Sequence, residues 1–393
     1  MAWVHSPASD AAFLARDAVD CLPAGGLERK LALDRPLRVK LGLDPTAPDV
    51  HLGHTVVLRK LREFQDHGHI VVLIIGDYTA RVGDPSGRSS TRPQLSGEEI
   101  DANALTYVEQ AAKVLDRERI ELRHNSEWLD MKMEELFALA RTTTVAQVLE
   151  RDDFAKRYAA NEPISILELL YPLMQAYDSV AVRADVELGG TDQKFNLLLG
   201  RDVQRAYGVA EQVVLTMPIL AGVDGERKMS KSLGNHIGVD EPPEEIYGRT
   251  LSVPDSAMGG WYGLLFGEDV PAELSPRDAK HLLARRLVER FHSPAAADAA
   301  AAHFERVFVQ HADPEEMDEA TFDGAAGAVH LPALIADGFG RSRGEARRLL
   351  AQGAVRLDGQ VLGGDELDIE PERLDGAVLQ VGKRGFRRLR RAA

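Results

Sequence analysis

The sequence predicts an α/β protein: a doubly wound parallel sheet with a helical insertion, followed by an α-helical domain and a small α+β domain. Four short apolar runs bounded by turn residues are typical of buried parallel strands, and they lie at 38–43, 70–76, 186–189 and 213–217. Residues 55–68, between the first two runs, carry apolar side chains at helical spacing and end at a glycine. This order predicts a βαβ unit with a right-handed crossover.

Further helices are expected before the third strand. Apolar periodicity predicts them at 101–115, 131–139 and 164–174. We expect the insertion to span about 125–183, within a first domain of residues 1–240.

The rest of the chain divides into three parts. Helical patterns at 243–251, 276–292 and 294–310 predict an α-helical domain over 241–312. Residues 313–330 are rich in acidic side chains, contain glycine and lack apolar periodicity, which predicts a linker. The final domain, 331–393, combines expected helices at 331–336 and 343–351 with expected strands at 354–357 and 378–381.

The composition excludes several classes of protein. The chain has 393 residues, 44% of them hydrophobic, which suits two or three folded domains rather than a disordered or fibrous chain. Its one cysteine, Cys21, excludes a disulfide framework and a cysteine-based zinc or iron–sulfur site. The first twenty residues do not resemble a secretory signal, and no run approaches ~18 apolar residues, so we expect a cytoplasmic protein without a membrane span.

Charge is distributed unevenly along the chain. The net charge is −15, yet residues 331–393 hold 12 basic and 9 acidic side chains. A basic end on an acidic body indicates a small module that meets a polyanion, although a chance fluctuation of surface charge is the plainer alternative.

The first chemical motif follows the strand at 38–43. His51 and His54, three residues apart, face the same side of the first helical turn, with Gly53 between them. A helix N-terminus at the carboxyl end of a parallel strand is suited to bind phosphate. Two capping or surface histidines are the alternative, and the position behind a strand favours function.

Three further groups of polar residues follow predicted strands or lie on one helix. Asp84 and Arg88 lie in a loop after the second strand, which taken alone is only a type I turn. Tyr171, Gln175 and Asp178 share one face of an apolar helix, which favours a polar pocket over a solvated face. Asp192 follows the third predicted strand and either binds ribose hydroxyls or caps the next helix.

The strongest motif is the segment Lys228-Met229-Ser230-Lys231-Ser232. Only 11 of the 47 basic residues are lysines, so two within four residues are unexpected. Lysines among small polar residues and flanking glycines describe a mobile cationic loop that can move with phosphate, and a solvated loop is the alternative.

Together, these motifs resemble a known family. His51-Leu52-Gly53-His54 and Lys228–Ser232 resemble the HIGH and KMSKS motifs of class I aminoacyl-tRNA synthetases. With the other groups above, they resemble the bacterial tyrosyl-tRNA synthetase subgroup over nearly the whole chain. The last sixty residues resemble an RNA-binding module shared with a small-subunit ribosomal protein.

The resemblance implies a role for each matching residue. Catalytic contacts to the phosphates would come from His51, His54, Lys228 and Lys231. The expected ATP-binding residues are Thr46, Gly53, Asp192, Ser232 and Arg88. The expected tyrosine-binding residues are Asp84, Tyr171, Gln175, Asp178 and Gln193. The expected tRNA-binding residues are Arg343, Arg347, Arg348, Lys383 and Arg384.

It also implies the reaction and the partners. A Rossmann-like catalytic domain would form tyrosyl-adenylate and pyrophosphate from L-tyrosine and ATP, then transfer the tyrosyl group to the 3′-terminal adenosine of tRNA(Tyr). Mg²⁺ would arrive on the ATP phosphates, with no protein-bound metal or prosthetic group. The helical domain would contact the anticodon region of the tRNA, and the protein would be a homodimer.

Two departures and three alternatives remain. Many members of the subgroup have tyrosine where this chain has Lys40, which leaves a second contact to the phenol unassigned, and tryptophan where it has Lys194. The alternatives are a tryptophanyl-type synthetase, a small-molecule nucleotidyltransferase and a catalytically silent, synthetase-derived RNA-binding protein. The polar helix face and the basic end speak against the first, and the basic end also speaks against the second. The intact His51, His54, Lys228 and Lys231 speak against the third.

Overall fold

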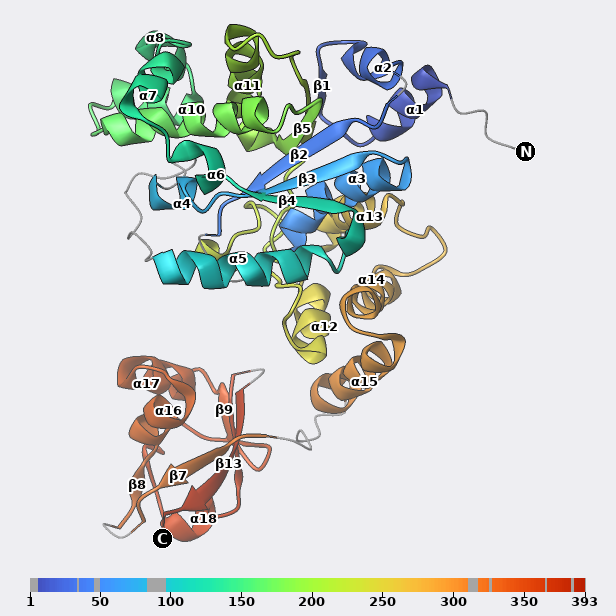
Figure 1. Ribbon diagram of the computed structural model, residues 1–393. Helices are drawn as coiled ribbons and strands as arrows, with labels where there is room; N and C mark the ends of the chain where they lie inside the picture. Colours follow the sequence, from blue (N-terminus) through green and yellow to red (C-terminus); the bar gives the residue numbers. More distant parts are fainter. Residues whose placement is uncertain are drawn as a thin grey trace. The chain divides into compact units, whose positions relative to one another are not determined.

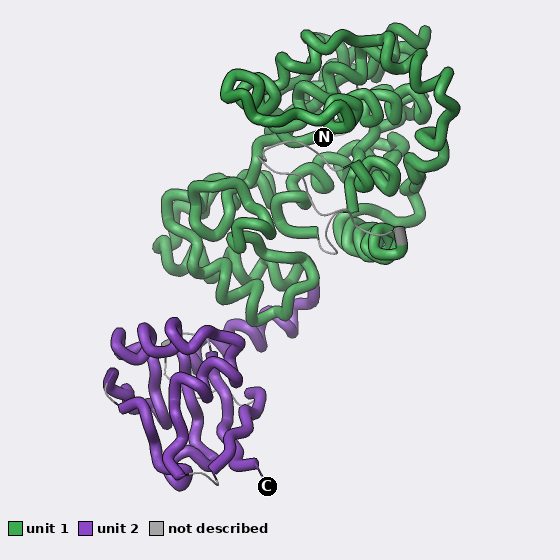
Figure 2. Tube along the Cα trace, turned by 90° about the vertical axis from the view of Figure 1, so that its left-hand side faces the viewer, with its two compact units in different colours: residues 1–291 green, residues 292–393 purple. Residues whose placement is uncertain are grey.

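The structure is a computed structural model of the chain (Figure 1). It describes residues 6–33, 35–45, 50–82, 97–309, 317–324, 327–364, 366–382 and 385–392. The chain forms two compact units, residues 1–291 and 292–393 (Figure 2).

The first unit is built on a six-stranded sheet of order β1-β6-β5-β2-β3-β4. Its strands are β1 (Asp20–Leu22), β2 (Arg38–Leu43), β3 (Ile70–Ile75), β4 (Ile120–His124), β5 (Val186–Gly190) and β6 (Val213–Met217). The five strands from β6 to β4 are parallel, and β1 pairs antiparallel with β6 at the edge. The sheet is therefore doubly wound, as predicted.

Helices cover both faces of this sheet. In Figure 1, α10 and α11 lie on one face, and α3 and α5 lie on the other. The helices up to β6 are α1 (Pro7–Leu14), α2 (Gly26–Leu31), α3 (Leu52–Asp66), α4 (Thr79–Val82), α5 (Gly97–Ala111), α6 (Ser126–Leu129), α7 (Met133–Ala140), α8 (Val145–Val148), α9 (Asp152–Ala159), α10 (Ile166–Ala181) and α11 (Lys194–Ala206). Those from α6 to α10 lie between β4 and β5, within the range predicted for the insertion.

Apolar burial explains the central elements. Five of the six residues of β3 are buried, as expected for a strand covered on both faces. The buried side chains of α3 include Leu58, Leu61 and Phe64, which recur at helical spacing.

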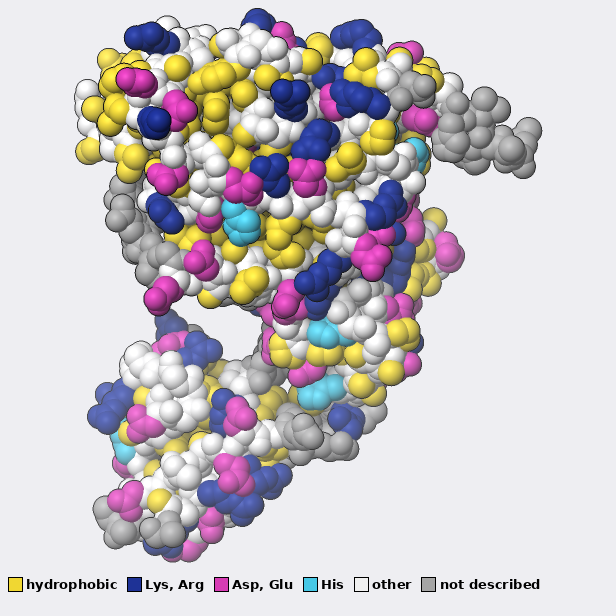
Figure 3. All heavy atoms as spheres, in the orientation of Figure 1, with side chains coloured by type: hydrophobic (Ala, Val, Ile, Leu, Met, Phe, Trp, Pro, Cys, Tyr) yellow, Lys and Arg dark blue, Asp and Glu magenta, His cyan; other side chains and the backbone are white. Residues whose placement is uncertain are grey.

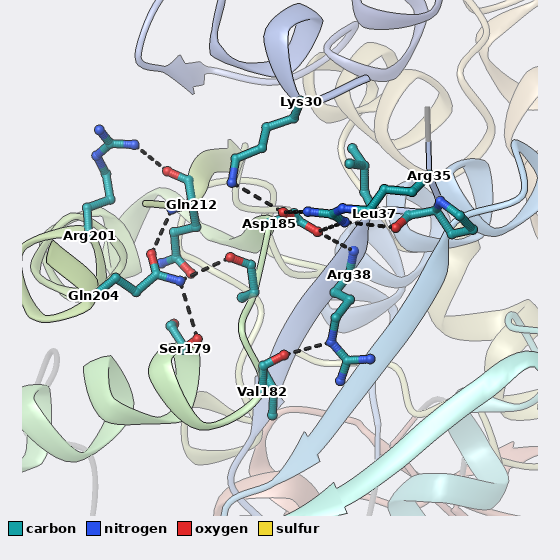
Figure 4. Close-up of polar contacts among 12 residues, drawn as sticks. Lys30, Arg35, Leu37, Arg38, Ser179, Val182, Asp185, Arg201, Gln204 and Gln212 are labelled. Atoms are coloured by element: carbon teal, nitrogen blue, oxygen red, sulfur yellow. Dashed lines mark hydrogen bonds and ion pairs between the residues drawn. The ribbon is translucent and has the colours of Figure 1, made fainter. Parts of the chain in front are cut away.

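Charged and polar contacts anchor the amino-terminal edge of the sheet (Figure 4). Asp185, just before β5, accepts hydrogen bonds of 2.7 and 2.8 Å from Arg35 and one of 3.2 Å from Lys30. Burial alone would raise the pKa of Asp185, but the hydrogen bonds from Arg35 and from the backbone N–H of Arg38 outweigh it and lower the pKa. This carboxylate therefore joins α2, β2 and β5.

After β6, the first unit ends in a helical part. Its helices are α12 (Pro243–Leu251), α13 (Met258–Phe266) and α14 (Pro276–Phe291). Trp261 and Tyr262 of α13 are fully buried, and the hydroxyl of Tyr262 donates a 2.7 Å hydrogen bond to the backbone oxygen of Ala279 on α14. None of the helices in the described residues combines the length and apolarity that a bilayer crossing needs.

The second unit is an α+β fold. Its helices are α15 (Pro294–Phe304), α16 (Leu331–Phe339), α17 (Arg343–Ala351) and α18 (Pro371–Leu374). Its strands are β7 (Glu319–Phe322), β8 (Val329–His330), β9 (Val355–Leu357), β10 (Gln360–Val361), β11 (Asp368–Ile369), β12 (Val378–Val381) and β13 (Gly385–Arg391). Five of them form a sheet of order β10-β9-β12-β13-β7, and β8 pairs with β11. Apolar residues of α16 and α17 pack with those of the sheet in one core.

The structure corrects several predicted boundaries. The four strands predicted in the first unit are confirmed, but β1 and β4 of that unit were not predicted. Helix α10 continues to Ala181, seven residues beyond its predicted end. Part of the predicted linker, residues 319–322, is instead strand β7, which pairs in parallel with β13 near the other end of the unit. The linker prediction failed because this pairing is not visible in the local sequence.

Candidate active site

A cavity of about 780 Å³ opens where the sheet reverses its strand order. From β2 the chain proceeds to β3 and β4 on one side, whereas β5 leads to β6 on the other. The carboxyl ends of the adjacent strands β2 and β5 line the cavity with Gly42, Asp44 and Gly189. Doubly wound sheets bind ligands at such a switch point.

Most of the predicted site residues lie in the walls of this cavity. They are His51, Gly53, His54, Tyr171, Gln175, Asp178, Asp192, Gln193, Lys228, Lys231 and Ser232. The predicted residues Thr46, Asp84, Arg88, Lys383 and Arg384 fall outside the described residues. Arg343, Arg347 and Arg348 lie exposed on α17 in the second unit.

His51 and His54 stand at the start of α3, and we call residues 51–54 the histidine turn. His51 is the N-cap, and its Nδ1 accepts a 3.2 Å hydrogen bond from the backbone N–H of Gly53. The backbone N–H of His51 donates in turn to Nδ1 of His54, also at 3.2 Å. The two rings stack with their centroids 3.9 Å apart. A Cβ on Gly53 would lie 2.9 Å from the ring of His51, so this fold of the turn requires glycine.

These contacts determine the charge and the tautomer of both rings. Burial, with the neighbouring His54, His236 and Lys231, lowers the pKa of His51 to about 2. Burial and the charge of Lys231 lower the pKa of His54 to about 4. Both rings are therefore neutral at pH 7, and because each Nδ1 accepts a hydrogen bond, each Nε2 carries the proton. The turn thus presents two neutral N–H donors beside the positive end of a 15-residue helix.

The segment Lys228–Ser232, here called the lysine loop, is closed by Asn235, a residue that is 3% exposed. Oδ1 of Asn235 accepts a 2.9 Å hydrogen bond from the backbone N–H of Ser230, and Nδ2 donates to the backbone oxygen of Lys228 at 3.1 Å and to Asp224 at 2.9 Å. A Cβ on Gly222 would lie 2.3 Å from the Asn235 amide. Asn235 therefore ties Lys228 and Ser230 of the loop to Asp224 before it.

The segment that follows the loop is paired with the histidine turn. The backbone N–H of Leu52 donates 2.9 Å to the oxygen of Ile237, and that of Val239 donates 3.0 Å to the oxygen of Val50. Across the cavity, Nζ of Lys228 lies 3.4 Å from Oδ2 of Asp192, after β5. These contacts bring the two histidines and the two lysines to one cavity.

Helix α10 lines another side of the cavity with Tyr171, Gln175 and Asp178, and we call this surface the α10 wall. Asp178 is 3% exposed and accepts a 2.8 Å hydrogen bond from Nε1 of Trp128. Burial raises the pKa of Asp178 to about 7, although the nearby Lys40 and the Trp128 hydrogen bond oppose this rise. The group therefore changes charge near neutral pH.

Two further networks fix the polar residues of this wall. The hydroxyl of Tyr171 donates 2.7 Å to Oδ2 of Asp44, whose Oδ1 accepts 2.8 Å from the hydroxyl of Thr79. Asn196, 2% exposed, donates to Oε1 of Gln175 at 2.7 Å and to Oε1 of Gln193 at 3.1 Å. The side chains of Tyr171 and Gln175 are thus held in place before any ligand arrives.

Sequence reasoning missed Trp128 and Asn196 and assigned no role to Asp44. Asp44 directly follows the strand predicted at 38–43, so its position was the available signal. Trp128 and Asn196 belong to no motif, and they reach the site only because α6 and α11 pack against α10.

The arrangement suits a phosphate group together with a small molecule that carries amine and hydroxyl groups. Neutral N–H donors, a helix N-terminus and lysines stabilise phosphate charge. A buried carboxylate, an amide and a phenol suit the amine and hydroxyl groups of a small molecule. Within the described part of the chain, no three histidine, cysteine or acidic side chains gather as a metal site.

Comparisons with known proteins agree with this chemistry. Residues 32–309 match the family model described as tRNA synthetases class I (W and Y). The chain is 53% identical to a tyrosine–tRNA ligase of Moorella thermoacetica, over 96% of this chain and 94% of the relative. It is 49% identical to a tyrosine–tRNA ligase of Thermotoga maritima, over 98% of each.

Solved structures share the fold. A tyrosyl-tRNA synthetase of Archaeoglobus fulgidus, complexed with L-tyrosine, aligns with a TM-score of 0.63 at 23% identity, over 75% of this chain and 99% of that one. A C-terminally truncated mitochondrial enzyme of Aspergillus nidulans aligns with the same score over 77% of this chain and 94% of that one, also at 23% identity.

Proposed function

The chain belongs to the class I tRNA synthetases for tryptophan and tyrosine, and we propose that the cavity between β2 and β5 carries out both of its steps. It acts as a tyrosine–tRNA ligase, as do curated relatives about half identical to it over nearly its whole length. The observation that carries the proposed site is the meeting of His51, His54, Lys228 and Lys231 with the α10 wall in one cavity.

In the first step, the carboxylate of tyrosine attacks the α-phosphorus of ATP. A bond forms between a carboxylate oxygen and phosphorus, the bond to the bridging oxygen breaks, and pyrophosphate leaves with that electron pair. A carboxylate is already ionised at pH 7, so this step requires no general base. The protein must position the reactants and stabilise charge on the phosphates.

The histidines and lysines supply that stabilisation. The Nε2–H groups of His51 and His54 donate hydrogen bonds to the phosphates of the transition state, and they remain neutral donors because of their low pKa values. Lys228 and Lys231 close over the β- and γ-phosphates from the loop. Asp192, Gly53 and Ser232 contact the rest of the nucleotide.

The α10 wall recognises the amino acid. Tyr171, Gln175 and Gln193 bind the ammonium end of tyrosine, with Asp44 holding Tyr171. Asp178 accepts a hydrogen bond from the phenol. Phenylalanine would leave this buried carboxylate without that donor, which is the basis of selection.

We expect Mg²⁺ to enter on the ATP phosphates. The cavity carboxylates are engaged by donors of the protein, since Asp44 accepts from Tyr171 and Asp178 accepts from Trp128. Such separated carboxylates do not form a cage, and Mg²⁺ commonly binds through substrate phosphates.

In the second step, the terminal adenosine hydroxyl of tRNA(Tyr) attacks the tyrosyl carbonyl, and AMP leaves. We propose that the second unit holds the tRNA through Arg343, Arg347 and Arg348. All three are exposed on α17, and in the part of the chain that the structure describes none forms an ion pair. We expect Lys383 and Arg384 to contribute as well, and the helical part to meet the anticodon region. The reaction would take place in the cytoplasm, which suits a chain with one cysteine.

We also propose a homodimer formed through the helical insertion. Large apolar side chains gather on the surface over α7, α8 and α10 (Figure 3). The exposed large apolar side chains of the helices from α7 to α10 are Met133, Phe137, Val145, Tyr158, Ile166 and Leu167, and Ile166 is 79% exposed. Exposed apolar patches mark interaction sites, and a second copy of the chain, as the resemblance implies, is the partner that we propose.

ATP–pyrophosphate exchange with each of the twenty amino acids tests the function directly. We expect exchange with tyrosine alone. Exchange driven by tryptophan, or by no amino acid, would contradict the proposal.

A further inference from the structure

Lys40 lies in the middle of β2 and has no exposed surface. Its ammonium group has three donors and three oxygen partners. Nζ lies 2.8 Å from Oε1 of Glu187, 2.8 Å from the hydroxyl of Ser179 and 3.0 Å from the backbone oxygen of Gln175. Lys40 is therefore committed to protein contacts and is not available to a substrate phenol.

The partner carboxylate is equally well satisfied. Glu187, on β5, is 1% exposed, and its Oε2 accepts a 3.0 Å hydrogen bond from Ser179 and another from the amide of Gln212. Gln212 is held in turn by Gln204, which also reaches the backbone of Ser179 (Figure 4). A buried ion pair persists only with such complete pairing.

This ion pair grips the turn of α10 that faces the substrate. Two of the three partners of Lys40 belong to residues 175 and 179, and Asp178 lies in the turn between them. The pair thus joins β2, β5 and α10 behind the cavity wall that carries Gln175 and Asp178.

The same pair dominates the charge around Asp178. The ionisable groups that act on it are Lys40 on β2, Glu187 on β5 and Asp44 after β2, and Trp128 on α6 donates a hydrogen bond to it. Lys40 is the only cation among them, and its effect opposes that of burial and of both carboxylates. Its charge favours the ionised form of Asp178, which accepts the stronger hydrogen bond.

We propose that Lys40 is a specificity-determining positioning residue: its ion pair with Glu187 holds the turn of α10 that places Asp178 for the phenol of tyrosine, and its own charge favours the ionised carboxylate. The inference rests on the proposed role of Asp178 and adds to it a residue that does not touch the substrate.

The test compares two variants with a matched control. Lys40→Met removes the cation, and Lys40→Met/Glu187→Gln removes both charges while it leaves an amide oxygen for Ser179 and Gln212. Lys60→Met is the control, because Lys60 is equally buried and ion-paired with Glu63 but lies on α3, outside the cavity lining. Circular dichroism verifies the fold of each variant, and pyrophosphate exchange gives kcat/KM for tyrosine and phenylalanine from pH 5 to 9.

We expect the preference of both Lys40 variants for tyrosine over phenylalanine to fall at least tenfold, mainly through KM. The acid limb of their pH profile, where kcat/KM falls as the pH drops, should move to higher pH. The shift should be smaller in the double variant, because Glu187 opposes Lys40. Lys60→Met should keep the wild-type preference and limb. A folded double variant with wild-type preference and an unmoved limb would overturn the inference. If Asp178→Asn also keeps the preference, the proposed role of Asp178 fails instead.

Discussion

The ammonium group of Lys228 lies 3.4 Å from the carboxylate of Asp192, so the lysine loop reaches across the cavity to the end of β5. Both side chains are more than a third exposed, at 46% and 37%. Such a pair contributes little to stability. Its consequence is functional, because the proposed ribose-binding carboxylate and a proposed phosphate-binding lysine meet where ATP would lie.

Asp192→Asn should therefore impair ATP binding without weakening the fold. We expect KM for ATP in pyrophosphate exchange to rise at least tenfold, because a hydrogen bond to a charged group contributes about 1.5–3 kcal/mol. The free energy of unfolding should change by less than about 0.5 kcal/mol. Asp202→Asn, which breaks an exposed ion pair with Arg205 elsewhere, is the control and should leave KM unchanged.

The activity should depend on the ionisation of Asp178. Because burial raises its pKa to about 7, kcat/KM for tyrosine should fall as the pH drops through 7 and reach a plateau above it. His51 and His54 stay neutral in this range and should add no further limb. A pH profile of pyrophosphate exchange measures this, and Asp178→Asn should abolish the limb. A limb near pH 4 in the wild type would contradict the assignment.

Charge on the apolar patch should prevent association. The double variant Phe137→Asp/Ile166→Asp should sediment as a monomer, whereas the wild type should sediment as a dimer. Leu105→Asp is the matched control, since Leu105 is 72% exposed on α5, outside the patch. Dimers that survive the double substitution would place the interface elsewhere.

Removing the three arginines of α17 should weaken tRNA binding alone. For Arg343→Ala/Arg347→Ala/Arg348→Ala, the slope of log affinity against log salt concentration should flatten by about 0.7–0.9 for each lost phosphate contact. Pyrophosphate exchange needs no tRNA and should be unchanged. An unaltered slope would remove these residues from the tRNA surface.

Local patterns predicted the parallel sheet because β2, β3, β5 and β6 are short apolar runs covered on both faces. Strand β4 was not predicted because it is an edge strand in which apolar and charged residues alternate. Strand β7 was not predicted because its partner, β13, is about seventy residues away in the sequence. Pairing between distant segments leaves no local signal.

The candidate site likewise contains residues that the sequence could predict and supporting contacts that it could not. His51, His54 and the lysine loop stand in contiguous motifs, and the structure places them in one cavity. The supporting contacts were not predicted: Trp128 on Asp178 and Glu187 on Lys40 join segments 50 and 147 residues apart. Such pairs become visible only when the helices and strands are assembled.

The central claim is that the histidine turn and the lysine loop act on one triphosphate, and Lys231→Ala tests it most directly. Loss of one such contact should lower kcat of tyrosine-dependent pyrophosphate exchange by roughly 10²–10³, or about 2.7–4 kcal/mol. Lys156→Ala, an exposed lysine paired with Asp152 in the insertion, is the control and should keep full activity. Tyrosine binding, measured by equilibrium dialysis without ATP, should stay within threefold of the wild type, roughly the scatter of near-neutral substitutions. Equal losses in exchange and in tyrosine binding would contradict the account.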